Sequence, residues 1–326
     1  MFEKIYYHDG EDHGAHSKPS KPSKKDPTPA TLPRDPSPLP NLGEHTALHH
    51  LLRYADVTIY SVKSGCWCET DTWNLGRLPN ENDRVLINEG HVVTIDETGD
   101  VALTLRVDGT LEFNRTTNTE LRVETLGNFG TLEIGTSGRP IDANVQARIV
   151  FRDTGPLDAS SDPLLQGRGL ISYGEVRIYG AEKTPFARLD TGVDTADGGD
   201  EGRLHLQEVP ADWRVGDTLL VPGTTHSENQ DELVTVVATD DSGLRVEPPL
   251  RFPHPVASPD APLMTDLGES DTEFKPDESR RQFVPIANLS RNVTLESENA
   301  GDIRRRAHVM LMGLSPVATC YAHFKN

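Results

Sequence analysis

The amino-acid sequence predicts an all-β protein organised as a β-solenoid. Only 6% of its 326 residues are aromatic, whereas glycine and proline number 27 and 24. This composition favours short strands and turns over a helical bundle. From Val57 onward, short segments of alternating apolar and polar residues follow one another, and glycines precede several of them at a regular spacing. The regular spacing indicates stacked rungs, because a β-sandwich would give short strands without a glycine-led period.

The first 56 residues precede this pattern. Eight prolines fall within residues 18–40. Because prolines without apolar partners cannot build a core, residues 1–45 are expected to form an extended, disordered leader. The residues that follow predict one short amphipathic helix over 46–56, with an apolar face made by Ala47, Leu48, Leu51 and Leu52.

A glycine-led repeat carries the prediction of a solenoid. Gly109 opens the segment GTLEF, Gly130 opens GTLEI and Gly174 opens GEVRI, and Gly90 opens the looser GHVVTI; the spacings are 19, 21 and 44 residues. We expect each glycine to adopt the special backbone angles of a turn, and each strand to pair with its equivalents in neighbouring rungs. The inward side chains would then form apolar ladders, made by Leu111 and Phe113, Leu132 and Ile134, and Val176 and Ile178.

Strand patterns continue after residue 182, although the glycine-led repeat does not. They fall at 212–223, 232–238, 243–250, 291–297 and 308–312, and the aperiodic stretch 253–283 is expected to be a long loop. We interpret 57–182 as one β domain and 183–326 as the first part of a β-helix. Because solenoids need capped ends and the last residues still have a strand pattern, we expect the β-helix to continue beyond this sequence.

Charge and hydropathy exclude several classes of function. Lys and Arg number 32 and Asp and Glu number 51, which gives a formal net charge of −19. Such a chain lacks the basic face that a duplex nucleic-acid binder needs. No segment reaches the roughly 18 apolar residues of a membrane span, and the first residues lack the apolar stretch of a cleavable signal peptide. We therefore predict neither nucleic-acid binding nor direct membrane insertion.

Three cysteines are too few for a disulfide framework. Cys66 and Cys68 flank Trp67, and a bridge between these two cysteines would close a very tight ring, so free thiols are expected. A metal-binding pair is the alternative. No second pair of ligands follows at the spacing of a zinc site, and no metal site is predicted.

Five runs of residues, starting at residue 65, resemble the eight-glycine domain family. They read GCWCETDTW, GRLPNENDRVLINEGHVVTID, LRVDGTLEF, FGTLEIGTSGRP and RGLISYGEVRIYGAEKTPFARL. The glycines that align with the family are Gly76, Gly90, Gly109, Gly130, Gly135, Gly169, Gly174 and Gly180. Later segments, from DWRVGDTLLV to RRAHVMLM, are similar to the start of the right-handed parallel β-helix that follows this domain in bacterial relatives. The resemblance implies an extracellular or cell-surface protein that handles glycans, hyaluronan above all.

The sequence also departs from this family. Relatives carry histidines where this chain has Tyr179 and Gly313, and an acid where it has His323. The resemblance then implies two hypotheses, a polysaccharide-cleaving enzyme and a non-catalytic module for glycan binding or adhesion. The missing groups favour binding. A purely structural role within a larger surface protein is a third reading.

Cleavage of a polysaccharide would require two carboxylates at a defined separation, or a base beside a neutralised uronate. The candidate catalytic residues lie in the second half of the sequence and are Asp217, Glu232, His254 and His308. The structural alternatives are a turn-capping carboxylate for Asp217 and a solvated strand edge for Glu232. The two histidines could equally have structural roles.

A glycan site would use aromatic rings for stacking and basic groups for acidic sugars. The candidates are Trp67, Trp73, Trp213, Arg280, Arg281 and Arg305, with a core position as the alternative for the tryptophans. Because an acidic protein repels a polyanion, binding would require a basic groove, a neutral glycan or a bridging calcium ion. The loop residues that could hold calcium are Asp266, Asp271 and Asp277, for which a solvated loop is the alternative.

Overall fold

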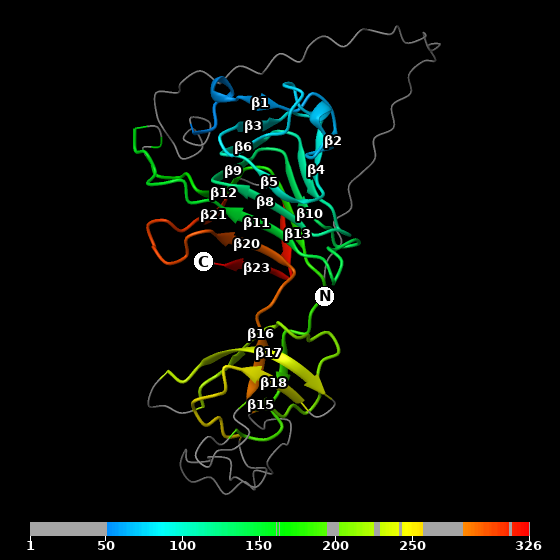
Figure 1. The fold of residues 1–326 in the computed structure, drawn as a ribbon, viewed down its shortest axis with the longest axis vertical. Helices are drawn as coiled ribbons and strands as arrows, with labels where there is room; N and C mark the ends of the chain where they lie inside the picture. Colours follow the sequence, from blue (N-terminus) through cyan, green and yellow to red (C-terminus); the bar gives the residue numbers. More distant parts are fainter. Residues whose placement is uncertain are drawn as a thin grey trace, which may run out of the picture. The chain divides into compact units, whose positions relative to one another are not determined.

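The computed structural model describes residues 51–325 except 161, 163, 194–201, 225–228, 241–242, 257–282 and 313–314. Its regular structure is almost entirely β-strand, arranged in four sheets (Figure 1). Two 3₁₀ turns, η1 (Tyr54–Asp56) and η2 (Thr70–Thr72), lie near the start. The predicted leader falls outside the described residues, as do residues 46–50 of the predicted helix.

Three parallel sheets wind together as a β-solenoid, as the sequence predicts. The first sheet has the order β1 (Ile59–Tyr60), β3 (Arg84–Ile87), β6 (Thr104–Val107), β9 (Thr125–Asn128), β12 (Gly169–Ser172) and β21 (His308–Leu311). The second has the order β2 (Gly65–Cys66), β4 (Val92–Ile95), β7 (Thr110–Phe113), β10 (Thr131–Ile134), β13 (Glu175–Tyr179) and β22 (Val317–Cys320). The third has the order β23 (Ala322–Lys325), β20 (Val293–Ser297), β11 (Ala147–Phe151), β8 (Thr119–Val123) and β5 (Thr98–Val101).

The predicted apolar ladders line the inside of this coil. In the second sheet, Leu111 pairs with Leu132, and Leu132 pairs with Val176. All three side chains are buried in one continuous core that also receives residues of the other two sheets. Because side chains in a strand alternate between faces, the in-register stacking places every second residue of each strand in the core.

The corner before the second sheet explains the repeated glycines. A Cβ atom on Gly130 would overlap the carbonyl oxygens of Gly109 and Asp108 in the preceding rung, and one on Gly174 would overlap the carbonyl oxygen of Gly130. None of these three glycines adopts the positive φ that the sequence analysis expects. At these three positions the repeat therefore reflects the close approach of stacked backbones. Gly90, which opens the looser segment GHVVTI, adopts the expected turn angles with a φ of 79°.

Between β13 and β20 the chain leaves the coil and builds an antiparallel sheet, called here the inserted sheet. Its order is β14 (Phe186–Arg188), β19 (Pro285–Asn288), β16 (Thr218–Val221), β17 (Glu232–Asp240), β18 (Gly243–Glu247) and β15 (Arg203–Leu204). Residues 183–326, interpreted as the first part of a β-helix, therefore contain this antiparallel sheet before β20, β21, β22 and β23 join the coil. A separate apolar core lies on the buried face of the inserted sheet.

The length of β17 distinguishes it from the strands of the coil. Over its first six residues, buried and exposed side chains alternate strictly. Such alternation is typical of an antiparallel sheet with one covered face. The strand is also nine residues long, whereas the strands of the coil have at most five.

Arg106 attaches the segment before β1 to the outer face of the first sheet. Its guanidinium carbon lies 3.9 Å from the ring centroid of Tyr54 and 4.2 Å from that of Phe129. It donates hydrogen bonds to the carbonyl oxygen of Leu52 at 2.8 Å and to Asp108 at 2.9 Å. Burial, followed by the hydrogen bond to Asp108, raises the pKa of Tyr54 to about 12. This cluster of rings and charges holds residues 52–54 against the coil.

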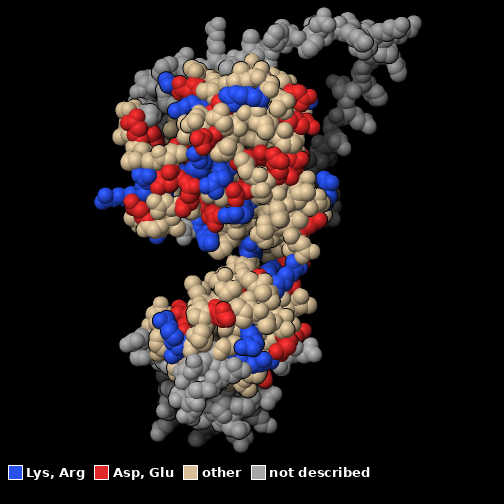
Figure 2. Space-filling view, in the orientation of Figure 1, with Lys and Arg blue, Asp and Glu red and all other residues tan. Residues whose placement is uncertain are grey.

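Charged side chains of both signs are interspersed on the visible face of the coil (Figure 2). Arg148 on β11 lies 2.7 Å from Glu120 on β8 and also pairs with Glu296 on β20. On the second sheet, Arg177 pairs with Glu133 at 2.8 Å. Neighbouring rungs therefore neutralise one another's charges. Within the described part of the chain, no helix is both long enough and apolar enough to cross a membrane.

We predict that Gly130→Ala destabilises the protein by at least about 2 kcal/mol, because the added methyl group meets backbone oxygens that cannot move independently. Urea unfolding would measure the loss. Gly138→Ala is the matched control, since its Cβ would meet no atom within 4 Å. Equal stability of the two variants would contradict the close approach of the rungs.

Candidate functional site

The structure brings together two of the four predicted catalytic residues. Glu232 begins β17, and its Oε2 atom lies 3.0 Å from Nε2 of His254. The other ring nitrogen of His254 lies 2.9 Å from the carbonyl oxygen of Pro222. The backbone amides of Arg251 and Phe252 donate to the same carboxylate at 2.9 and 3.1 Å. Both Glu232 and His254 are buried, so the pair is shielded from a polymeric substrate.

His254 lies between two hydrogen-bond acceptors. Its two ring nitrogens face the carbonyl oxygen of Pro222 and the carboxylate of Glu232. Burial by itself raises the pKa of Glu232, but the hydrogen bonds from His254 and from two backbone amides outweigh it and lower that pKa. The arrangement is that of a buried ion pair.

The other two predicted catalytic residues lie elsewhere. Asp217 pairs with Lys183 at 2.6 Å and accepts a hydrogen bond from the backbone amide of Arg214 at 2.9 Å. It precedes β16, whose far end pairs with Glu232, so the strand separates these two carboxylates. His308 begins β21 in the coil, and burial lowers its pKa. The four candidates therefore do not form one site.

All three tryptophans proposed for glycan stacking are buried. Trp67, Trp73 and Trp213 are 1%, 2% and 4% exposed. Trp67 and Trp73 pack edge to face, with ring centroids 5.0 Å apart, at the start of the coil core. Trp213 belongs to the core of the inserted sheet. None presents a ring face to a sugar. All three occupy core positions, which was the alternative stated for them.

Of the three arginines proposed for glycan binding, the structure describes one. Arg280 and Arg281 lie outside the described residues, as do the calcium candidates Asp266, Asp271 and Asp277. Arg305 is described, and its guanidinium pairs with Asp153 at 2.6 Å. The hydrogen bond from Arg305 lowers the pKa of Asp153 to about 2. Arg305 is therefore engaged within the fold.

Two phenylalanines, which the sequence analysis did not select, form an exposed aromatic surface on the inserted sheet. Phe186 is 48% exposed and Phe283 is 38% exposed, and their rings stack with centroids 6.4 Å apart. The guanidinium carbon of Arg188 lies 4.0 Å from the ring centroid of Phe283. The antiparallel pairing of β14 with β19 brings these residues together. Their separation of 97 positions hides this surface from a reading of the sequence.

A hollow of about 500 Å³ lies beside Phe186. Its lining includes Arg188, Gln207 and Glu208, which supply hydrogen-bond donors and acceptors, together with small apolar residues. Its volume falls within the range of roughly 300–1,000 Å³ that is typical of ligand sites. An aromatic face, a cation and polar groups therefore meet at one place on the surface. We call this place the Phe186 surface.

A larger cavity, of about 900 Å³, lies on the first sheet of the coil. Residues of β3, β6 and β9 contribute to its lining, together with Thr154, Pro156, Leu157, Asp158, Ser160, Asp162, Leu164 and Gly167. Its lining mixes leucines with charged residues such as Arg84 and Glu124. No aromatic residue is among the described residues that line it, so it offers no stacking platform for a sugar.

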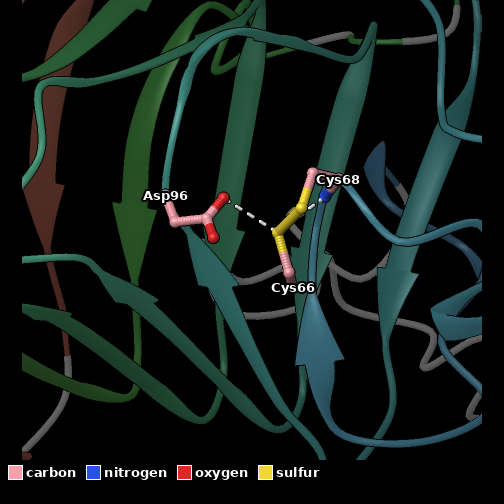
Figure 3. A group of neighbouring side chains, drawn as sticks. All are labelled: Cys66, Cys68 and Asp96. Carbon is pink, nitrogen blue, oxygen red and sulfur yellow. Dashed lines mark hydrogen bonds between the residues drawn. A yellow bond between two sulfur atoms is a disulfide. The ribbon is translucent and has the colours of Figure 1, made fainter.

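Cys66 and Cys68 form a disulfide, so the prediction of free thiols is wrong for this pair (Figure 3). Their Cα atoms are 5.2 Å apart, within the range that a disulfide can span. Cys320 is free and exposed. The carboxylate of Asp96, which follows β4, lies 2.9 Å from the sulfur of Cys66. The sequence analysis missed Asp96 because only the pairing of β2 with β4 brings it to the cysteines.

Further carboxylates surround this corner of the coil. Asp100 on β5 is buried, and its Oδ2 atom has no hydrogen-bond partner among the described residues. Burial, followed by the charges of Glu97 and Asp96, raises the pKa of Asp100 to about 8. With that pKa, the carboxyl of Asp100 is largely protonated at neutral pH.

We predict that Glu232→Gln destabilises the protein by about 3–5 kcal/mol at pH 7, because it leaves His254 without its counter-charge. Since the pKa of Glu232 is lowered on folding, its stabilisation is present above the ordinary pKa and is lost as the pH falls through the lowered one. Urea unfolding between pH 7 and pH 3 would therefore show a weaker acid dependence in the variant. Glu247→Gln, at an exposed position of β18, is the control, and an equal effect of both changes would refute the ion pair.

Comparisons with known proteins agree with the glycine pattern. Residues 72–190 match the family model described as the G8 domain. Fibrocystin-L of Mus musculus is 27% identical over 210 residues, which cover 62% of this chain and 4% of that protein. Fibrocystin-L of Homo sapiens is 26% identical over 215 residues, covering 62% of this chain and 5% of that protein. Fibrocystin of Canis lupus familiaris is 24% identical over 181 residues, which cover 54% of this chain and 4% of that protein.

This chain thus spans only 4–5% of the length of these relatives. No solved structure matches it at a significant level. The resemblance to the eight-glycine family, predicted from the ordered glycine-led segments, is confirmed. Residues 72–190 match the G8 domain, and the chain is similar in sequence to the fibrocystin-like proteins.

Proposed function

We propose that this chain is an extracellular, adhesion-type module that binds a glycan at the Phe186 surface. The exposed ring of Phe186 beside a hollow lined by Arg188, Gln207 and Glu208 is the observation that carries the proposal. Sugar rings have apolar C–H faces that pack on aromatic rings, and their hydroxyls bind planar polar side chains. The Phe186 surface offers both kinds of contact within one hollow.

Charge favours a neutral or weakly acidic glycan. The hollow holds one basic and one acidic side chain, Arg188 and Glu208, within a protein of net charge −19. A strongly acidic polymer such as hyaluronan would be repelled by the protein as a whole. Arg148 and Arg177 on the coil already pair with glutamates, so they offer little to a polyanion.

Burial of the acid–base candidates favours binding over cleavage. Hydrolysis needs a carboxylate that reaches the scissile bond. Glu232 and His254 bind each other inside the inserted sheet, and Asp217 is engaged by Lys183. The Phe186 surface itself presents one carboxylate, that of Glu208. We therefore expect retention of a glycan without new chain ends.

The comparisons support an extracellular location and a role as one part of a longer protein. The relatives are fibrocystin-like proteins many times longer than this chain, which is consistent with one module of a large cell-surface protein. If no glycan binds, a structural module of such a protein is the second candidate.

We predict that Phe186→Ala weakens the affinity for whichever glycan the unaltered chain binds by about tenfold. This corresponds to a loss of about 1.4 kcal/mol of binding free energy, because the stacking face is removed. The full chain would be tested by calorimetry against oligosaccharides of hyaluronan, chondroitin, alginate, pectin and a neutral glucan. Reducing ends would be measured in the same samples.

Leu233→Ala is the matched control for this experiment. Leu233 is 59% exposed on β17 of the same sheet and does not line the hollow. Its substitution should leave the affinity unchanged. Failure of all five glycans to bind, or equal affinities of Phe186→Ala and the unaltered chain, would overturn the proposal. The appearance of new reducing ends would show that the chain cleaves the glycan, and the proposal of a non-catalytic binding module would be wrong.

A further inference from the structure

We propose that reduction of the Cys66–Cys68 disulfide opens a binding site for a thiophilic divalent cation, with Asp96 as the third ligand. The two sulfurs and a carboxylate oxygen of Asp96 all lie within 4.8 Å of one another. Figure 3 shows the carboxylate pointing at the sulfur of Cys66. Three protein ligands with one open position are a common arrangement for zinc and similar ions.

The fold places these ligands by strand pairing. Cys66 is the last residue of β2 and pairs with Thr94 of β4. Asp96 follows β4 by one residue, so both side chains emerge at the same end of two adjacent strands. The side-chain hydroxyl of Thr117 donates a hydrogen bond to the backbone oxygen of Asp96 at 3.0 Å and fixes this position. Cys66 at the end of β2 and Asp96 directly after β4 are therefore positioned by the pairing of these two strands.

The surroundings suit a dithiol and a cation better than a disulfide. A thiol at Cys66 can donate a hydrogen bond to Asp96, whereas a disulfide sulfur has no proton to donate. The backbone amide of Cys68 donates to the sulfur of Cys66 at 3.0 Å, a contact that stabilises a thiolate.

The chemistry balances as a reduction followed by a ligand exchange. A dithiol reductant supplies two electrons and two protons, which break the sulfur–sulfur bond, and is itself oxidised to its disulfide. The cation then forms bonds to both sulfurs and to Asp96, and the two thiol protons pass to solvent. A small-molecule disulfide would reverse the reduction: it accepts two electrons from the two thiolates, becomes two thiolates itself, and the re-formed Cys66–Cys68 bond releases the cation. The oxidation state of the cysteines thereby controls occupancy.

Titration of the full chain with Cd²⁺ tests this proposal. The Cys320→Ser background removes the third thiol, which is exposed and separate. After reduction and removal of the reductant without oxygen, we expect one equivalent of Cd²⁺ to bind, with a thiolate-to-cadmium charge-transfer band. The oxidised protein should show no such band.

Two variants of that background separate the roles of the ligands. Asp96→Asn should weaken binding of Cd²⁺ to the reduced chain by at least about tenfold. Asp71→Asn, which changes an exposed acid in the nearby η2 turn, should not alter it. Absence of the band after reduction, equal binding by the oxidised protein, or unchanged affinity in Asp96→Asn would overturn the proposal.

Discussion

The close approach of successive rungs at one corner is the constraint on which the coil depends. At Gly130 and Gly174 the carbonyl oxygen of the preceding rung occupies the space of a Cβ atom. Because the backbones meet there, the strands on either side stack in register, and inward residues such as Leu111 and Leu132 fall into continuous ladders. Bulky side chains are excluded from this corner. They project instead into the core or onto the outer faces of the sheets.

This constraint separates the molecule into a scaffold and an insertion that is free to vary. On the coil, charged residues of neighbouring rungs pair across the ladders, as Arg148 does with Glu120. The inserted sheet follows antiparallel rules and has its own core. Its exposed face carries Phe186 and Phe283, which no rung repeat dictates. The surface proposed for glycan binding thus lies where the repeat does not restrict the choice of side chain.

Periodicity made the coil predictable, because glycine-led strands and inward ladders are local patterns. The same sequence misled about the reason for the glycines, since close approach of backbones depends on the rung above. The inserted sheet was missed because the alternation in β17 also occurs in strands of the coil such as β8. Phe186 meets Phe283, and Cys66 meets Asp96, only through pairing between distant strands. Such contacts are properties of the fold, and no spacing in the sequence encodes them.

The most direct test of the account is hydrogen exchange of the full chain with and without the glycan that it retains. Amide protection reports where a ligand orders the backbone. We expect increased protection in peptides covering 184–188 and 207–211, which contribute to the lining of the hollow of the Phe186 surface, with no change in the strands of the coil. Protection confined to 154–167, beside the larger cavity on the first sheet, would contradict it.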